Sequence, residues 1–456
     1  MTAPLPQDDL QAFLAAHEKA DAFTLIFTDL CGVQRGKMLR RSEMEAAYRD
    51  GRFMPGSIMS LDVTGTDVEE TGLVWEDGDA DRIARPVAGS LVPAPWEGDE
   101  AAQFIVRMTE HDGSPSICDP RNVLERVVQR FDEISLTPVA AIELEFYLFD
   151  LESAVAGRPV PPKALNGAGR PQHFQAYYLS DLDDFGPFLR DVYKAAEAQG
   201  LPARTLISEY APGQMEIVLQ HQPDALKAAD QAIMFKRLVK AVALKHGMIA
   251  GFMAKPYSDF SGSGMHVHVS LQDKDGTNAF ADADPKGNQL MRHAIGGLKA
   301  TMAECMGLWA PNANSYRRFR AKSYAPVSAT WGVNNRTVSL RVPAGGPETR
   351  HIEHRIAGAD ANPYLALAGV LAGIHHGITK ELDPGPAVEG NGYDLPTEPF
   401  PLNWFRANEV LRKSAFARSY LGDFLVETFC TIKEAEADRF FAEPTPLDFD
   451  FYLRSV

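Results

Sequence analysis

The stretch Gly262–Leu271 carries two imidazoles and a hydroxyl at alternate positions: His266, His268 and Ser270. Its opening glycines predict a tight turn into a strand. Successive side chains of a strand point to opposite faces, so these three polar groups share one face and the apolar residues between them face a core. Paired imidazoles favour a metal ligand with polar neighbours for a nucleotide. The alternative is two core histidines that are hydrogen-bonded to carbonyl groups.

Glu143 and Glu145 stand two positions apart in the strand-like segment 139–149. Their carboxylates therefore point the same way, and the apolar residues beside them point to the other face. Like charges side by side are unfavourable unless something neutralises them. Hard divalent cations such as Mg²⁺ and Mn²⁺ prefer carboxylate oxygens, which makes a metal site one interpretation. A solvated sheet edge is the other.

Three more glutamates strengthen the metal interpretation. Glu209 and Glu216 flank an Ala-Pro-Gly turn, and Glu353 lies farther along the chain. The odd separation of the first two would put them on opposite faces of a straight strand, but the bend can bring them together. Five glutamates and His266 would furnish two sites of three protein ligands each. Two adjacent divalent ions with open positions are a device for phosphoryl transfer.

Several arginines fit the same chemistry, because a guanidinium group makes bidentate contacts with phosphate and carboxylate that lysine cannot match. They are Arg317, Arg318, Arg336, Arg341 and Arg355. Surface salt bridging is the alternative for any one of them. Arg341 lies between Leu340 and Val342 and is therefore a better candidate for a buried role than Arg317.

Composition narrows the classes of function. The 456 residues are enough for two or more domains, and the net charge of −16 makes nucleic acid an unfavourable partner and suits a cationic substrate. No apolar run reaches the length of a membrane span, and the N-terminal residues lack the features of a leader. The four cysteines are widely separated, which predicts reduced, buried thiols in a cytoplasmic protein.

The elements that must position these residues follow from periodicity and turn signals. A hairpin is expected over 23–39 and strands over 139–149 and around the turn in 207–219. Helices are expected over 8–20, 42–48 with Ser42 as N-cap, 122–132 after the cap Asp119, 185–198, 224–247, 288–306 and 363–376. The pattern predicts a small α+β domain over residues 1–112 and a large domain over residues 113–456.

Taken together, these motifs resemble the type I glutamine synthetases over nearly the whole chain. The glycine-histidine block is a highly specific signature, and all matching elements occur in the family's order. They are Glu143-x-Glu145, Glu209 through Ala-Pro-Gly-Gln-x-Glu216, Lys255-Pro256, Gly262–Leu271, Asn314-Ser315-Tyr316-x-Arg318, Asn335-Arg336 to Arg341, and Glu353-x-Arg355 to Tyr364.

The resemblance implies an α+β fold with an N-terminal β-grasp domain and a large catalytic domain of antiparallel sheet and helices. It implies that ATP phosphorylates the γ-carboxylate of L-glutamate and that an amine nitrogen then displaces phosphate. It also implies two to three bound Mg²⁺ or Mn²⁺ ions. The family analogue is a double ring of hexamers with each site built between neighbouring subunits.

The resemblance also implies a role for each site residue. One ion would be held by Glu145, Glu209 and Glu216, and the other by Glu143, His266 and Glu353. Arg318 and Arg355 would orient glutamate, with Gly262 and Tyr177 also at the substrate. Arg336 and Arg341 would stabilise the transferring phosphoryl group, Glu209 would act in catalysis, and His268, Ser270 and Arg336 would lie towards the nucleotide.

The chain departs from the ammonia-using members of the family at two carboxylates. Pro55 stands where they place an ammonium-binding Asp, and Tyr324 stands where they place a Glu on a flap. Ser261 replaces a usual Asn. A small cation in a dry pocket needs anionic partners, and both are missing here. The loop Gly390–Pro396 resembles one that some members adenylylate at its tyrosine, here Tyr393, and the resemblance leaves that modification open.

These departures favour an ATP-dependent glutamate–amine ligase similar to the γ-glutamylpolyamine and γ-glutamylmonoamine synthetases. The amine, its base and the metal stay open, with a slight preference for a diamine because acids lie near Pro55: Asp62, Asp67, Glu69 and Glu70. A true glutamine synthetase that holds ammonium through Glu209 is one alternative. A non-catalytic ring that senses glutamate or ATP is another.

Overall fold

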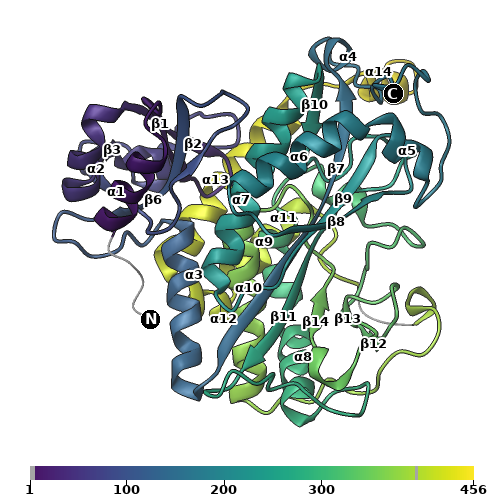
Figure 1. Cartoon of the computed structure of the whole chain (residues 1–456). Helices are drawn as coiled ribbons and strands as arrows, with labels where there is room; N and C mark the ends of the chain where they lie inside the picture. Colours follow the sequence, from purple (N-terminus) through teal and green to yellow (C-terminus); the bar gives the residue numbers. More distant parts are fainter. Residues whose placement is uncertain (1–5, 396–398) are drawn as a thin grey trace.

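The computed structural model describes residues 6–395 and 399–456 (Figure 1). Met1–Leu5 of the N-terminal segment and Pro396 of the loop around Tyr393 lie outside the described residues. The chain forms a mixed α/β structure with two β-sheets, one in its N-terminal part and a larger one in its C-terminal part. The expected fold class is confirmed.

The N-terminal sheet has six strands in the order β2-β1-β6-β4-β3, with β5 paired to β6. The expected hairpin is the antiparallel pair of β1 and β2, and the parallel pairing of β1 with β6 makes the sheet mixed. The elements of this part are α1 (Pro6–Ala16), β1 (Ala22–Thr28), β2 (Gln34–Arg40), α2 (Met44–Asp50), β3 (Arg52–Pro55), β4 (Asp81–Pro86), β5 (Val92–Pro93) and β6 (Ala101–Thr109).

The expected capping of the second helix by Ser42 is wrong. Residues Arg41–Glu43 form a 3₁₀ turn, and α2 begins only at Met44. Ser42 lies inside that turn, where the side chain of Glu43 instead accepts from the backbone N–H of Arg40 at 3.0 Å. This hydrogen bond from Arg40 to the Glu43 carboxylate has replaced the local serine signal.

The C-terminal sheet has eight strands in the order β12-β13-β14-β11-β7-β9-β8, with β10 paired to β7. The pairings are antiparallel except that of β12 with β13, which is parallel. The strands are β7 (Thr137–Asp150), β8 (Ala203–Ser208), β9 (Gln214–Leu219), β10 (Met248–Gly251), β11 (Met265–Gln272), β12 (Trp331–Val333), β13 (Leu340–Val342) and β14 (Ile352–His354).

Helices cover the apolar face of this sheet, as Figure 1 shows for α3, α7 and α10. Asp119 accepts from a backbone N–H group at the start of α3, as expected, and Asp224 does the same at the start of α7. The helices are α3 (Pro120–Gln129), α4 (Leu151–Val155), α5 (Leu179–Asp184), α6 (Gly186–Ala198), α7 (Ala225–Lys245), α8 (Gln289–Thr301), α9 (Met306–Trp309), α10 (Pro363–Thr379), α11 (Trp404–Lys413), α12 (Ala415–Leu421), α13 (Asp423–Ala442) and α14 (Pro446–Tyr452).

The main core lies between the large sheet and these helices, and it contains the apolar residues that alternate with the glutamates of β7. A small cluster made by Ile26, Val87, Ile105 and Met234 packs the N-terminal sheet against α7. All four cysteines are buried and free, as expected. Burial of this apolar surface fixes the strands that carry the candidate site.

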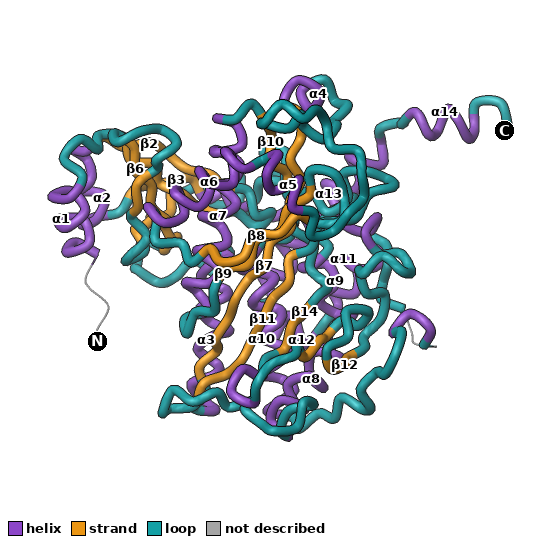
Figure 2. The backbone as a smooth tube through the Cα atoms, turned by 45° about the vertical axis from the view of Figure 1, so that its right-hand side comes forward, coloured by secondary structure: helices purple, strands orange, loops and turns teal. Residues whose placement is uncertain are grey.

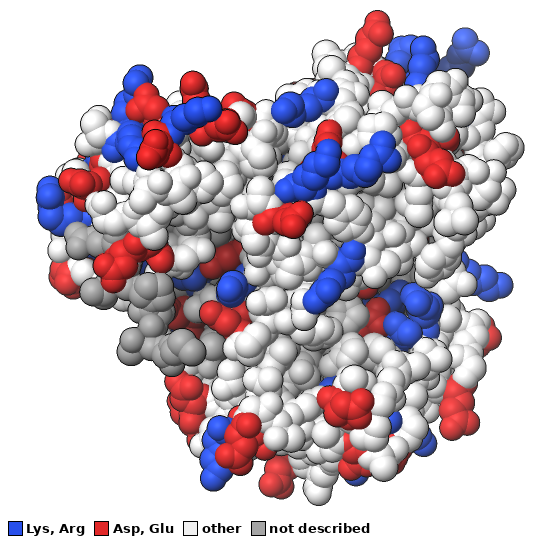
Figure 3. Space-filling model, in the orientation of Figure 1, with Lys and Arg blue, Asp and Glu red and all other residues white. Residues whose placement is uncertain are grey.

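The outer surface carries charged side chains of both signs. Figure 3 shows acidic and basic side chains interspersed over the visible face, so no single sign of charge dominates it. Figure 2 shows α14 extending away from the rest of the chain, and its residues are exposed. Among the described residues, none of the helices has the length and apolarity of a membrane span.

Candidate active site

Four adjacent strands bring the predicted carboxylates and histidines together. On β7 and β11, Glu143 stands opposite His266. On β7 and β9, Glu145 stands opposite Glu216. On β11 and β14, His268 stands opposite Glu353. Directly paired residues share a face of a sheet, so all six side chains emerge on the face away from the main core.

The distances confirm that the side chains meet. Nδ1 of His266 lies 2.5 Å from Oε1 of Glu143 and 3.7 Å from Oε1 of Glu353, and its Nε2 lies 3.9 Å from Oε1 of Glu145. Oε2 of Glu143 lies 3.4 Å from Nε2 of His268. The structure therefore offers two overlapping donor groups: Glu143, Glu145 and His266, and Glu143, His268 and Glu353.

The Ala-Pro-Gly turn brings Glu209 to the same cluster. The turn connects β8 to β9, and the backbone N–H of Glu209 donates to the carbonyl of Gln214 at 2.9 Å. Burial and the charge of Glu145 raise the pKa of Glu209 to about 7. Burial and the nearby charges of Glu143 and Glu145 raise the pKa of Glu216 to about 11. The bend at the turn therefore brings Glu209 and Glu216 together, although their odd separation would place them on opposite faces of a straight strand.

Glu143 and Glu353, on the other side of the cluster, stay ionised. Burial would raise the pKa of Glu143, but the charges and hydrogen bonds of His266 and His268 outweigh it and hold the pKa well below its usual range. Burial likewise opposes ionisation of Glu353, and the charges of Arg355 and the two histidines lower its pKa to about 2. The cluster thus combines ionised carboxylates with two that need a further positive charge to ionise.

Whether a divalent cation fits the cluster depends on the carboxylates that lack a positively charged partner. Glu145, Glu209 and Glu216 are packed together with no arginine or lysine paired to them among the described residues. Carboxylate oxygens and one imidazole suit Mg²⁺ or Mn²⁺, and a divalent charge would relieve the repulsion that raises the two pKa values. The donor set fits such ions.

Two buried arginines, Arg318 and Arg355, and the half-buried Arg341 lie around the cluster. Nη1 of Arg341 donates to Oε2 of Glu353 at 2.7 Å, and its Nη2 donates to Oδ1 of Asn334 at 3.0 Å. Arg355 also pairs with Glu353. Arg318 is buried and donates from Nη1 to the carbonyl of Ile356 at 3.0 Å. By contrast Arg317 is exposed, as its sequence context predicts.

The glycines before β11 serve close packing, so the expected tight turn is wrong. Neither Gly262 nor Gly264 has a positive φ. A Cβ at Gly262 would meet Cγ of Arg318 at 2.3 Å and the carbonyl of Ala254 at 2.9 Å. The backbone N–H of Gly264 donates to Oε2 of Glu145 at 2.8 Å. Absence of a side chain lets this segment lie against both Arg318 and the carboxylates.

Gln214 is a site residue that the sequence reasoning missed. Its Nε2 donates to the carbonyl of Gly262 at 2.9 Å and lies 3.5 Å from Oε2 of Glu145. Gln214 thereby connects the first residue of β9 to the glycine segment. Its position in the Ala-Pro-Gly-Gln motif could have identified it as a site residue, but strand periodicity alone did not indicate a function for it.

The remaining predicted residues lie around this centre or apart from it. Ser270 is half-buried on the same face of β11 as His268. Tyr324 and the exposed Arg336 line a cavity of about 630 Å³ with Asn334 and Glu389. The backbone N–H of Tyr177 donates to the carbonyl of Ser208 at 2.8 Å, next to Glu209.

Pro55 lies apart from these residues within one chain. It ends β3, the edge strand of the N-terminal sheet. Figure 1 shows that strand in the N-terminal part, away from β7 and β11.

With this geometry in hand, the chain can be compared with known proteins. The model of the glutamine synthetase catalytic domain matches residues 117–452. The chain belongs to the glutamine synthetase family. Its resemblance to the ligases of that family is therefore confirmed.

Relatives in the glutamine synthetase family include enzymes named for amines. Gamma-glutamylputrescine synthetase PuuA of Escherichia coli (strain K12) is 38% identical over 98% of this chain and 95% of that protein. Glutamate–isopropylamine ligase of Pseudomonas sp is 32% identical over 92% of each chain. The solved GmaS/ADP complex superposes with a TM-score of 0.85 at 26% identity, covering 98% of this chain and 99% of that one.

Proposed function

We propose that this family member is a glutamate–amine ligase, which uses ATP to join the γ-carboxylate of L-glutamate to a polyamine or a monoalkylamine. One observation carries the proposal. The carboxylate–histidine cluster and its arginines are intact, whereas Pro55 and Tyr324 occupy the positions at which ammonia-using members place carboxylates. The two amine-named relatives described above support it.

The proposed reaction has two steps. An oxygen of the γ-carboxylate forms a bond to the γ-phosphorus of ATP, and the bond from that phosphorus to the bridging oxygen breaks, releasing ADP. The amine nitrogen then bonds to the acyl carbon of γ-glutamyl phosphate, the bond from that carbon to the phosphate oxygen breaks, and phosphate leaves. Glu209 is the proposed acceptor of the amine proton, because it lies in the carboxylate cluster directly before Tyr210 of the aromatic rim described below.

Each group in the site has a proposed place in this scheme. Mg²⁺ or Mn²⁺ would be held by Glu143, Glu145, Glu209, Glu216, His266 and Glu353, and when bound would neutralise charge on the transferring phosphoryl group. Arg336 and Arg341 stabilise the same group, and Arg318 and Arg355 hold the carboxylates of glutamate. Gly262 lets Arg318 approach. His268 and Ser270 face the nucleotide.

An aromatic rim beside Glu209 supports an alkyl amine. Tyr210 is 53% exposed and Phe174 is 42% exposed, and their ring centroids lie 5.7 Å apart. Phe174 also packs edge-on against Phe260 at 5.0 Å. Such rings offer apolar surface and π faces to an alkylammonium ion. Each buried methylene is worth about 0.8 kcal/mol, or roughly fourfold in kcat/KM.

The acids near Pro55 no longer favour a diamine. Asp62 is buried, and its carboxylate accepts from the backbone N–H groups of Thr64 at 2.8 Å and Thr66 at 3.0 Å and pairs with Arg439. Asp67, Glu69 and Glu70 are exposed. The proposal therefore covers both amine types.

The position of Pro55 supports the proposed ring. Because β3 lies apart from the glutamate cluster within one chain, Pro55 would complete the amine pocket of a neighbouring subunit in a double ring of hexamers. The proposed domain division at residues 112 and 113 separates the part that reaches the neighbour from the part that carries the metal ligands.

The test is ADP release with L-glutamate and a panel of amines that includes ammonium, putrescine and short alkylamines. We expect ammonium to be the poorest nucleophile, and Glu145→Ala to abolish release with every amine. If ammonium matches or exceeds every amine in kcat/KM, the protein is a glutamine synthetase. Absence of ADP release with all of them would favour the non-catalytic ring.

A further inference from the structure

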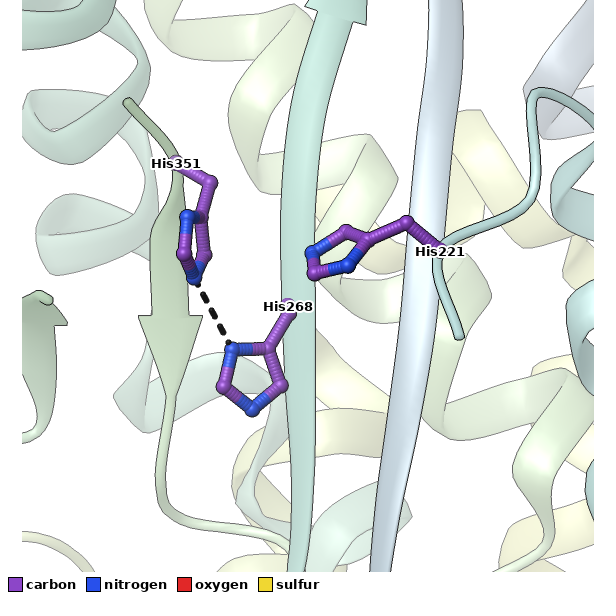
Figure 4. Close-up of side chains that lie close together, drawn as sticks. All are labelled: His221, His268 and His351. Atoms are coloured by element: carbon purple, nitrogen blue, oxygen red, sulfur yellow. Dashed lines mark hydrogen bonds between the residues drawn. The ribbon is translucent and has the colours of Figure 1, made fainter. Parts of the chain in front are cut away.

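Three histidines gather beside the carboxylate cluster: His221, His268 and His351 (Figure 4). His268 comes from β11, His351 directly precedes β14, and His221 follows β9. Ala141 of β7 stands opposite His268 in the sheet. Its small side chain leaves room for the rings of His221 and His268 to approach across β7, with centroids 5.9 Å apart.

The outer nitrogens of two of these rings lie near oxygen atoms. Nδ1 of His351 lies 2.7 Å from the carbonyl of Thr349. A carbonyl only accepts, so Nδ1 carries the proton and Nε2 is the acceptor. Nε2 of His268 lies 3.4 Å from a carboxylate oxygen of Glu143.

Nδ1 of His268 and Nε2 of His351 share a hydrogen bond of 3.2 Å. A metal ion in place of the shared proton would bind both nitrogens. Zinc–nitrogen bonds of about 2.0–2.1 Å in tetrahedral geometry put ligating nitrogens about 3.3–3.4 Å apart. One nitrogen from each of the three histidines lies within 4.8 Å of the others, so the exposed His221 needs only a small movement to join them.

We propose that His221, His268 and His351 form a binding site for a Zn²⁺-type transition-metal ion at the edge of the carboxylate centre. Imidazole suits Zn²⁺, Co²⁺, Ni²⁺ and Cu²⁺, whereas the glutamate-rich centre suits Mg²⁺ and Mn²⁺. The carbonyl of Thr349 and the carboxylate of Glu143 orient two ligands through their other nitrogens, an arrangement that is typical of histidine zinc sites.

The site has a consequence for the nucleotide, and this part rests on the proposed function. A metal ion on His268 would occupy space that the ATP phosphates need, and Glu143 would contact both centres. Zn²⁺ would then compete with ATP. The metal site itself is independent of this consequence, because it follows from the three imidazoles alone.

The test measures Zn²⁺ binding by competition with a chromophoric chelator. The carboxylate centre contributes its own Zn²⁺ binding, because carboxylate and imidazole groups hold Zn²⁺ more tightly than Mg²⁺. We expect His221→Ala and His351→Ala each to weaken the binding of one Zn²⁺ per chain by about tenfold or more. His246→Ala is the matched control, because His246 pairs with Asp191 elsewhere on the chain. Equal affinity in all four proteins would overturn the proposal.

Co²⁺ supplies a second measurement that does not depend on turnover. Tetrahedral coordination by nitrogen gives Co²⁺ strong visible absorption, which we expect in the parent and not in His351→Ala. Weak absorption in the parent would mean that His268 and His351 share only a proton and would also overturn the site. Zn²⁺ binding without ADP release from any amine would refute the proposed function alone, and Zn²⁺ binding that leaves ATP affinity unchanged would refute the competition alone.

Discussion

Glu145 and Glu216 stand directly opposite each other on β7 and β9. Like charges in this position destabilise a sheet, and burial of Glu216 increases the cost. The pKa of Glu216 is raised to about 11 by burial and by Glu143 and Glu145, so the metal-free pair holds a proton at neutral pH. A divalent cation bound at this proposed site would therefore compete with protons for the same oxygens.

The first prediction concerns the pH dependence of stability without metal. The pKa values of Glu209 and Glu216 are raised to about 7 and about 11 from 4.5, so the folded chain binds more protons than the unfolded chain above pH 4.5. Their contribution to stability is present below that pH and is lost as pH rises, up to about 7 for Glu209 and up to about 11 for Glu216. We expect the Tm of metal-free protein to fall between about pH 5 and pH 8.

Saturating Mg²⁺ should remove most of that fall, because it binds the ionised carboxylates. Calorimetry with and without Mg²⁺ isolates the effect from Asp29 and Asp119, whose pKa values burial also raises to about 6. Parallel Tm curves in the two conditions would contradict the assignment of Glu209 and Glu216 to the metal centre.

The second prediction concerns Glu216→Gln, which keeps the shape of the side chain and removes its charge. We expect the metal-free variant to be more stable than the parent at alkaline pH, and its Mn²⁺ affinity to fall by about tenfold or more. Scanning calorimetry measures the stability, and titration calorimetry measures the Mn²⁺ affinity. The exposed Glu197→Gln on α6 is the control and should change neither quantity. Unchanged Mn²⁺ affinity would exclude Glu216 as a ligand.

The third prediction concerns Arg341→Lys. Lysine cannot reproduce the fork that contacts both Glu353 and Asn334. We expect kcat for ADP release to fall by about 100-fold with a small change in the KM for glutamate. The exposed Arg317→Lys is the control and should behave like the parent. Equal losses in both variants would make the effect of Arg341 nonspecific.

The fourth prediction concerns the amine pocket. Tyr324→Glu and Pro55→Asp together place carboxylates at the two positions of the proposed amine pocket. We expect the kcat/KM ratio of ammonium to propylamine to rise by at least about tenfold, since anionic partners favour a small cation and disfavour an alkyl group. Steady-state kinetics gives the ratio. A ratio equal to that of the parent would remove both residues from the amine pocket.

The fifth prediction concerns Gly262→Ala. The added Cβ would displace Arg318, because it would lie 2.3 Å from Cγ of that residue. Misplacing a substrate-positioning group by about 1 Å can cost about 100-fold in kcat/KM, and we expect a loss of that order for glutamate. Gly369→Ala in α10 is the control, since its Cβ has no neighbour closer than 3.4 Å. Retained activity in Gly262→Ala would mean that Arg318 does not bind glutamate.

The sequence by itself determined which faces the site residues occupy. Strand alternation put Glu143 with Glu145 and His266 with His268, because a period of two is a local property of the backbone. The helix cap at Asp119 was also a local signal, and the structure confirms it. The predicted N-cap at Ser42 was wrong because Ser42 lies inside the 3₁₀ turn Arg41–Glu43, which precedes the helix.

Only the tertiary structure decided which of these faces meet. The register that sets His266 against Glu143 joins residues 123 positions apart, and no local signal encodes such a pairing. The meeting of His221, His268 and His351 likewise depends on strand order and on the small Ala141 between two of them. Glu353 is held by two arginines for the same reason: long-range sheet pairing, driven by burial of the apolar face, places the polar face as a consequence.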